Sequence, residues 1–223
     1  TVIPLMNWVS EEAAESEYEK IQNVDDIWTP IFSGNVKGVE NAIAMGVDIN
    51  IRGDDAYTPD SIMVQGEGYW LRFDTTGTTT ITGNPIDALT ISLSEGWNLV
   101  SGLHEDISIY SFNDSDSTIV PNTLFGFSDA YFLTEELVPG KGYWLRAFQD
   151  GEVTITGGAL SRVTPKDFSL NDRANTLTVN GMDLYFGVEM SGRERLSYSL
   201  PPKPPAGASD VRFKGDTRIT KEK

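Results

Sequence analysis

The sequence predicts a mainly β protein with two related sandwich-like or barrel-like modules, a short helical insertion in the first module, and a partial β segment at the C-terminal end. Three observations support this fold class. A 29-residue segment occurs twice, at residues 55–83 and 129–157, with a constant offset of 74 and no gap. From Ile62 onward, short runs rich in Thr, Val, Ile, Tyr and Trp alternate with Gly, Asn, Asp and Pro. Helical periodicity is confined to the region before residue 47.

Two helices are expected near the start of the chain. Residues 10–24 begin with Ser10, a residue type that caps helices, followed by acidic residues in the first turn. A second apolar face is formed by Val36, Val39, Ala42 and Ile43, and Gly46 stands where such a helix would end.

Strands are expected over most of the remaining chain. The clearest runs are 68–73, 78–82, 88–93, 97–101, 108–111, 142–147 and 152–156. A hairpin is expected from 175–179 and 183–189 around the turn Asn180-Gly181. The proline-rich residues 201–205 should be extended. These elements predict a first module at residues 1–84, a second at 85–160, and a partial β domain with an extended tail at 161–223.

Composition narrows the chemistry. The chain contains no cysteine and one histidine, His104, so disulfides and thiolate sites are excluded and most zinc sites and catalytic triads are disfavoured. The net charge is -16, and residues 1–160 hold 25 acidic and 6 basic side chains, against 8 and 11 in residues 161–223. An acidic surface repels phosphate, so we expect no binding to nucleic acid. No apolar run approaches the roughly 18 residues of a membrane span, so no membrane insertion is expected.

Two motifs resemble a known class of module. Residues 95–102, Glu-Gly-Trp-Asn-Leu-Val-Ser-Gly, and residues 139–146, Pro-Gly-Lys-Gly-Tyr-Trp-Leu-Arg, are similar to repeats of large secreted and surface proteins of marine and Bacteroidetes-related bacteria. Asn-Trp-Val-Ser at residues 7–10 looks like a partial counterpart in the first module. Residues 174–208 resemble the segment that precedes C-terminal sorting domains of the type IX secretion pathway. The resemblance implies an extracellular or cell-surface location and modular construction, and it implies no reaction.

Residues 27–59 carry a second resemblance, to one ankyrin repeat. Ser33-Gly34-Asn35, Gly46-Val47-Asp48-Ile49-Asn50 and Thr58-Pro59 match that pattern, whereas the Leu-His and Ala-Ala expected after Thr-Pro are missing. A single repeat of this kind is stable mainly by stacking on neighbours. A helical insertion in the first module is the alternative interpretation.

The repeated segment supplies the candidate ligand-binding residues. Arg72 and Arg146 follow Tyr-Trp-Leu in the two copies, so each is a candidate for holding a sugar or carboxylate against an aromatic ring. The alternative is a structural arginine that shields the rim of the core or forms an internal salt bridge, for which the repeated Asp55 and Asp129 are candidate partners. Large aromatics usually lie in a core, as we expect for most of Trp70, Trp97 and Trp144. Tyr69 and Tyr143 should point to the opposite strand face and are the better ligand candidates.

The loop at residues 113–117 is the candidate metal site. Asn113, Asp114 and Asp116 offer oxygen ligands at the spacing of calcium loops, although the glycine and distant glutamate of a full EF-hand are missing. A solvated turn is the alternative. His104, beside Glu105 and Asp106, is expected to make a structural hydrogen bond rather than to catalyse.

These observations lead to a functional expectation. The chain should be a non-enzymatic, acidic module of a larger protein that serves adhesion, spacing or ligand binding. A carbohydrate-binding accessory module of a polysaccharide-degrading enzyme and an ankyrin-like protein-binding scaffold are the alternatives. Its expected partners are a polysaccharide or a surface protein and other domains of the same polypeptide. No cofactor is expected other than calcium.

Overall fold

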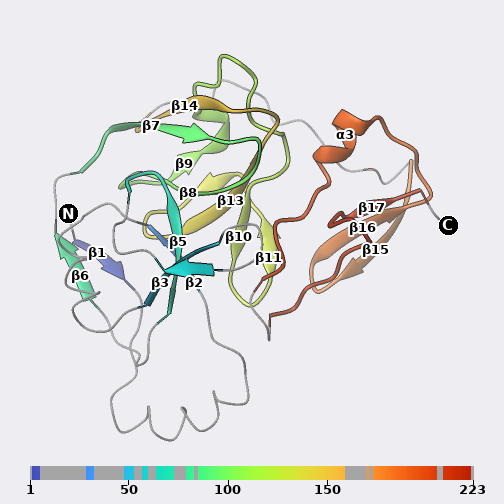
Figure 1. The fold of residues 1–223 in the computed structure, drawn as a ribbon, viewed down its shortest axis with the longest axis horizontal. Helices are drawn as coiled ribbons and strands as arrows, with labels where there is room; N and C mark the ends of the chain where they lie inside the picture. The colour runs from blue at the N-terminus through green and yellow to red at the C-terminus, as the bar shows by residue number, and fades with distance from the viewer. Residues whose placement is uncertain are drawn as a thin grey trace, which may run out of the picture.

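The computed structural model describes residues 2–5, 29–32, 48–52, 57–59, 64–72, 79–82, 85–158, 170, 173–204 and 208–221. For the strands before residue 64, and for residues 71–72 and 79–82, it describes the backbone alone. These residues are mainly β, as predicted, and form several small sheets (Figure 1). The described sheets do not close into a barrel, so the barrel-like alternative is not found among them.

The second copy of the repeated segment lies in a two-layer unit between residues 85 and 158. One layer is the four-stranded sheet β11–β10–β13–β8, and the other is the strand pair β14–β7. The strands of this part are β7 (Ala88–Leu93), β8 (Gly96–Ser101), β9 (Ile107–Ser108), β10 (Phe125–Phe127), β11 (Tyr131–Leu133), β12 (Glu136–Leu137), β13 (Gly142–Ala147) and β14 (Gly151–Thr156). Apolar side chains of the two layers, among them Ile91, Val100, Leu145 and Ile155, form one core.

The backbone of the first module repeats the two layers of the second. Its strands are β1 (Val2–Leu5), β2 (Thr29–Phe32), β3 (Asp48–Arg52), β4 (Tyr57–Pro59), β5 (Gly68–Arg72) and β6 (Thr79–Thr82). The sheet order β4–β3–β5–β2 matches β11–β10–β13–β8, and the pair β1–β6 matches β7–β14. The register agrees as well, because Trp70 lies between Pro30 and Asn50 as Trp144 lies between Leu99 and Phe125.

The two modules pack through equivalent strands. β5 contacts β13, β5 also contacts β8, and β13 contacts β2. β5 corresponds to β13, and β2 corresponds to β8. The contact of β5 with β8 and the contact of β13 with β2 are therefore equivalent contacts, as in a two-fold symmetric dimer. The Ser101 N–H also donates to the Gly66 carbonyl at 2.9 Å. The chain therefore contains an approximate two-fold pair of modules.

Gly68 marks a close approach between the modules. A Cβ atom at this position would lie 2.8 Å from the Val100 carbonyl oxygen and 2.9 Å from Leu99 Cγ. Both distances are too short for a side chain unless β8 moves. The glycine that precedes Tyr-Trp in the repeat thus has a packing reason at this position.

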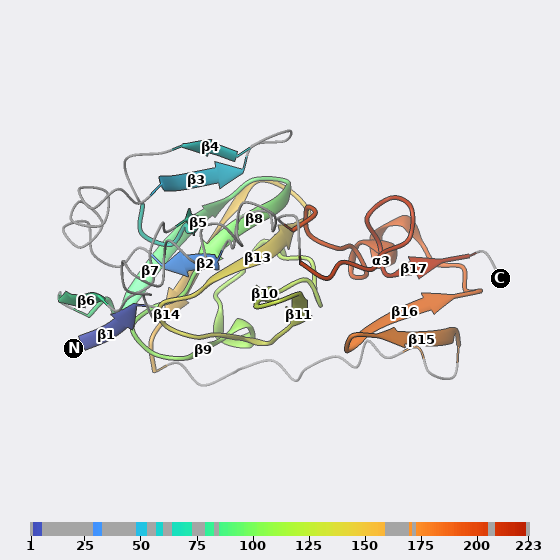
Figure 2. The ribbon, with the colours of Figure 1, turned by 90° about the horizontal axis from the view of Figure 1, so that it is seen from below.

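The C-terminal part forms a separate small sheet beside the modules (Figure 2). It consists of β15 (Asn175–Val179), β16 (Met182–Phe186) and β17 (Ile219–Thr220), with a short helix α3 (Gly192–Leu196) between β16 and β17. β15 and β16 are antiparallel, and β17 runs parallel to β16. Asn180 and Gly181 both have positive φ, 50° and 79°, as a two-residue hairpin turn requires.

Several expectations need correction or fall outside the described residues. β9 ends at Ser108, and Ile109–Ser111 form a 3-10 turn because the Ser108 hydroxyl accepts a hydrogen bond from the Tyr110 N–H at 3.3 Å. The strands β10, β11 and β12 were not predicted from the sequence.

Three predictions lie outside the described residues: the helix at 10–24, the helical face at 36–46 and the Asn-Trp-Val-Ser counterpart at 7–10. In the first module, the strand equivalent to β8 is β2. Among the described residues, none of the helices has the length and apolar composition needed to cross a bilayer.

Candidate functional site

The two repeated tyrosines are packing residues. Tyr69 and Tyr143 are 0% and 2% exposed. They do point away from the tryptophan face of their strands, but that side is covered too, and Tyr143 lies in the core of the second module. Each hydroxyl accepts a backbone hydrogen bond, from Val64 at 2.8 Å and from Val138 at 2.9 Å. Both tyrosines are therefore buried, and ligand binding by Tyr69 and Tyr143 stays a prediction.

The opposite face of β13 belongs to an aromatic cluster shared by three parts of the chain. Buried Trp70 comes from the first module, Trp144, Phe125 and Tyr131 come from the second, and Leu200 comes from the C-terminal part. We call this set the aromatic cluster. The rings meet edge to face, a favourable geometry, as between Phe125 and Tyr131 at 6.4 Å. The Trp144 indole N–H donates to the Tyr131 hydroxyl at 3.1 Å.

Arg146 and Trp97 lie at the margin of the aromatic cluster. They are opposite each other on β13 and β8, and the guanidinium carbon is 5.6 Å from the centre of the Trp97 ring. Both side chains are half-buried. Burial lowers the pKa of the Arg146 guanidinium, while the Glu95 carboxylate raises it. The Arg146 guanidinium thus lies over the ring of Trp97, and its part in ligand binding stays a prediction.

The predicted salt bridge of Arg146 is absent from the described residues. No described ion pair includes Arg146. The backbone carbonyl of Asp129 accepts a hydrogen bond from the Ser209 N–H at 3.0 Å. The Arg146 Nε is buried and has no hydrogen-bond partner among these residues. In the first module the backbone of Arg72 lies opposite Asp48, while its side chain and Asp55 fall outside the described residues.

Arginines also fasten the C-terminal part to the second module. Arg218 is 2% exposed, and its guanidinium carbon is 5.7 Å from the centre of the Phe125 ring. Burial lowers the pKa of Arg218 to about 10, while nearby Tyr185, Tyr198 and Asp183 favour the charged form. Arg193 stacks on Phe148 at 4.2 Å. The C-terminal part is therefore held by cation-π contacts in addition to Leu200.

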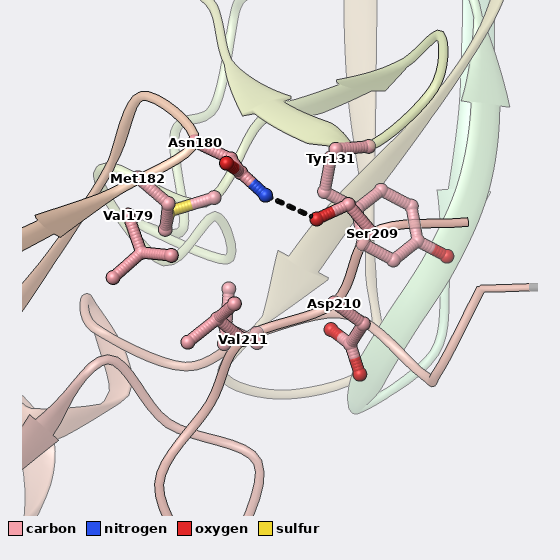
Figure 3. A pocket seen from close by; sticks show the side chains of 9 residues that line it. Tyr131, Val179, Asn180, Met182, Ser209, Asp210 and Val211 are labelled. Atoms are coloured by element: carbon pink, nitrogen blue, oxygen red, sulfur yellow. Dashed lines mark hydrogen bonds between the residues drawn. The ribbon is translucent and has the colours of Figure 1, made fainter. Parts of the chain in front are cut away.

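A crevice lies where the C-terminal part meets β11 (Figure 3). Tyr131, Met182 and Val211 contribute apolar walls, and the Asn180 amide donates to the Ser209 hydroxyl at 2.6 Å across it. Asp210 is the charged residue in its lining, and both of its carboxylate oxygens accept hydrogen bonds from Arg212 Nε, at 2.9 and 2.8 Å. The crevice thus offers no uncommitted acid or base for catalysis.

In the loop predicted to bind calcium, the Asp114 carboxylate accepts hydrogen bonds from the backbone of the same loop. The two Asp114 carboxylate oxygens accept the backbone N–H groups of Thr118 at 2.8 Å and Ile119 at 2.9 Å. Asn113 pairs through its backbone with Thr154, and Asp116 lies close to the Ser115 hydroxyl at 3.5 Å. Calcium binding by Asn113, Asp114 and Asp116 stays a prediction, and the structure gives Asp114 a role in closing the loop.

The described part of the chain also lacks a cluster of metal-ligating side chains. There, no three His, Asp or Glu side chains come together in a way that would hold a metal ion. His104 Nδ1 lies 2.9 Å from the Ile86 carbonyl oxygen, a structural hydrogen bond of the kind expected for this residue.

The sequence missed the residues that join the parts. Leu200 lies in a proline-rich tail and Phe125 lies in a three-residue strand, so neither carries a periodic signal.

Comparison of the chain with family models, with curated proteins and with solved structures gives no match.

Proposed function

We propose that the chain is a non-catalytic module of a larger secreted or cell-surface protein, and that it holds neighbouring parts at a fixed spacing for adhesion or ligand presentation. The observation that carries the proposal is the aromatic cluster, in which Trp70, Trp144 and Leu200 bring together the first module, the second module and the C-terminal part. A buried contact of large aromatic side chains resists bending between the parts, because separating them would expose that surface to water.

The repeated residues support this structural role. Tyr69 and Tyr143 are buried, Gly68 allows close packing, and the repeated tryptophans lie in the aromatic cluster. Side chains that a ligand would need are thus already used to build the fold. A spacer requires rigidity and solubility, and the net charge of -16 favours solubility.

The absence of cysteine allows a direct test of rigidity. Exposed Gln65, Ser92 and Lys214 lie in the first module, the second module and the C-terminal part. Each pair would be changed to cysteine and spin-labelled, so labels attach at the chosen sites alone. We expect one narrow distance distribution for each pair, measured by pulsed electron resonance. Broad or multiple distributions between the parts would contradict the spacer role.

Carbohydrate binding at Arg146 and Trp97 is a second candidate function. Its support is the half-buried guanidinium on the indole ring, with a nitrogen that has no partner among the described residues. The variant Arg146→Ala should then lose binding on a glycan array while Lys141→Ala, which changes an exposed residue just before the other end of β13, keeps it. The protein-binding scaffold interpretation of residues 27–59 stays a prediction.

A further inference from the structure

β15 is an open edge of the C-terminal sheet. In the order β15–β16–β17, nothing among the described residues pairs with its outer side. Residues 175–178 are all exposed, and Leu177 at 53% is the most exposed of the large hydrophobic side chains in the described residues. The strand Asn-Thr-Leu-Thr-Val contains no charged residue, no proline and no bulge. Natural edge strands usually contain a charged residue, a proline or a bulge, because these features prevent pairing with other strands.

The hairpin determines which backbone groups point outward. In a two-residue hairpin the residues that flank the turn, Val179 and Met182, exchange hydrogen bonds, and so does every second pair, including Leu177 and Leu184. The opposite edge of β16 shows the same alternation, because the Tyr185 N–H donates to the carbonyl of Arg218, the residue just before β17, at 2.7 Å. Opposite Tyr185 lies Thr176. The N–H and C=O groups of Thr176 and Thr178 therefore face the open edge.

We propose that β15 pairs in an antiparallel manner with β15 of a second copy of this chain, about a two-fold axis at Leu177. Thr176 of each copy then lies opposite Thr178 of the other, and the outward N–H and C=O groups of these threonines form four backbone hydrogen bonds. Leu177 meets its own counterpart in a non-hydrogen-bonded pair, where side chains are closest. The strand is thus complementary to itself in this register, as an isologous contact requires.

Repulsion between the acidic modules disfavours two-fold contacts between copies elsewhere on the chain. Residues 1–160 carry 25 acidic and 6 basic side chains, so two copies repel each other over the modules. Residues 161–223 carry 8 acidic and 11 basic side chains. The C-terminal sheet also lies at the opposite end of the molecule from β1 and β6 (Figures 1 and 2). Pairing through β15 therefore keeps the two acidic parts apart.

Two properties of the dimer follow. One pair of five-residue strands covers less than a standard protein interface, so the association is weak and depends on protein concentration. Added salt screens the repulsion between the acidic modules, so the dimer becomes stronger as the ionic strength rises. A contact that depended on ion pairs would weaken instead.

The test is analytical ultracentrifugation of the chain over protein concentrations up to about 1 mM, at low salt and at about 0.5 M salt. We expect the dimer fraction to rise with both. Leu177→Lys and Thr176→Pro should each weaken dimerisation at least tenfold, because one places like charges at the axis and the other removes an outward N–H that the fold does not use. Leu133→Lys is the matched control, since Leu133 is also an exposed strand leucine and lies in the second module.

Hydrogen exchange gives a second measurement that does not depend on how well the variants fold. The amide protons of Thr176 and Thr178 in the unchanged chain should become more protected as protein concentration rises. A chain that stays monomeric under all these conditions overturns the proposal. It is equally overturned if Leu177→Lys and Thr176→Pro fold and dimerise normally, if Leu133→Lys weakens the dimer as much, or if both amides are protected at every concentration.

Discussion

The hydroxyl of Tyr143 accepts a hydrogen bond from the backbone N–H of Val138 at 2.9 Å. The same bond occurs 74 residues earlier, where the hydroxyl of Tyr69 accepts from Val64 at 2.8 Å. The two copies therefore share this hydrogen bond as well as their sequence. In each copy the tyrosine hydroxyl binds the backbone of the segment that precedes its own strand. The phenol adds a second bond in the first copy, where it donates to Glu67 Oε2 at 2.8 Å.

Tyr143→Phe should lower the free energy of unfolding by about 1 kcal/mol. The ring remains in the core, but the Val138 N–H loses its partner. Denaturant unfolding measures the difference, and Tyr69→Phe should have an effect of the same sign. If neither variant differs from the unchanged chain, the repeated hydrogen bond does not contribute to stability.

Gly68→Ala should destabilise the chain by about 2 kcal/mol, because the added methyl group would overlap the β8 backbone at Val100. Gly192→Ala is the control. A Cβ at Gly192 meets no atom within 4 Å, and alanine is the better helix former at that position in α3. Equal stabilities of the two variants would show that β5 and β8 are not in close contact.

Asp114→Ala should destabilise the chain by about 2 kcal/mol, since it leaves the N–H groups of Thr118 and Ile119 without their acceptor. Asp116→Ala, which removes a neighbouring carboxylate of the same loop, should have a much smaller effect. A titration with millimolar calcium, followed by the melting temperature, tests the metal site, and an unchanged melting temperature would argue against it. A calcium-dependent rise would instead support the metal site predicted at Asn113, Asp114 and Asp116.

Alkaline pH should weaken the fold partly through Tyr110. Burial and the hydrogen bond that its phenol donates to Glu135 at 2.8 Å raise the pKa of Tyr110 from 10.0 to about 12. The folded state therefore keeps this proton when the unfolded state releases it. The stability that Tyr110 contributes is complete below pH 10 and is lost as pH rises toward 12.

Ultraviolet absorbance titration of the folded chain should show several tyrosines that ionise late, because burial raises the pKa of Tyr143 and Tyr198 as well, and Tyr110→Phe should remove one tyrosine from this late phase. The unfolding free energy of Tyr110→Phe should also fall less steeply between pH 10 and pH 12. Identical titration curves for the variant and the unchanged chain would contradict the assignment.

Much of the β structure was accessible from local sequence. β7 and β13 have the predicted boundaries, and the hairpin forms around Asn180 and Gly181, because alternation and turn chemistry act over a few residues. β10 and β11 were missed, since three residues give too little pattern; β11 pairs with β10, and β10 pairs with Trp144 on β13. β2 was missed because its sequence, Thr-Pro-Ile-Phe, bears little likeness to the equivalent β8.

The candidate site was predicted less well. Strand alternation correctly places Tyr143 and Trp144 on opposite faces, but it does not tell which face is covered by the rest of the protein. Here both faces are covered, one by β7 and β14 and the other by parts of the chain before residue 84 and after residue 160. Leu200 and Arg218 belong to the part after residue 160 that covers the tryptophan face, and their positions depend on tertiary contacts alone.

The account depends most on the aromatic cluster joining the two modules and the C-terminal part into one cooperative unit. Calorimetry of the whole chain tests this directly, with Trp144→Ala as the informative variant. We predict one transition whose calorimetric and van 't Hoff enthalpies agree, and a loss of about 4 kcal/mol in unfolding free energy for the variant. Separate transitions for the three parts of the unchanged chain, or a Trp144→Ala variant as stable as the unchanged chain, would contradict it.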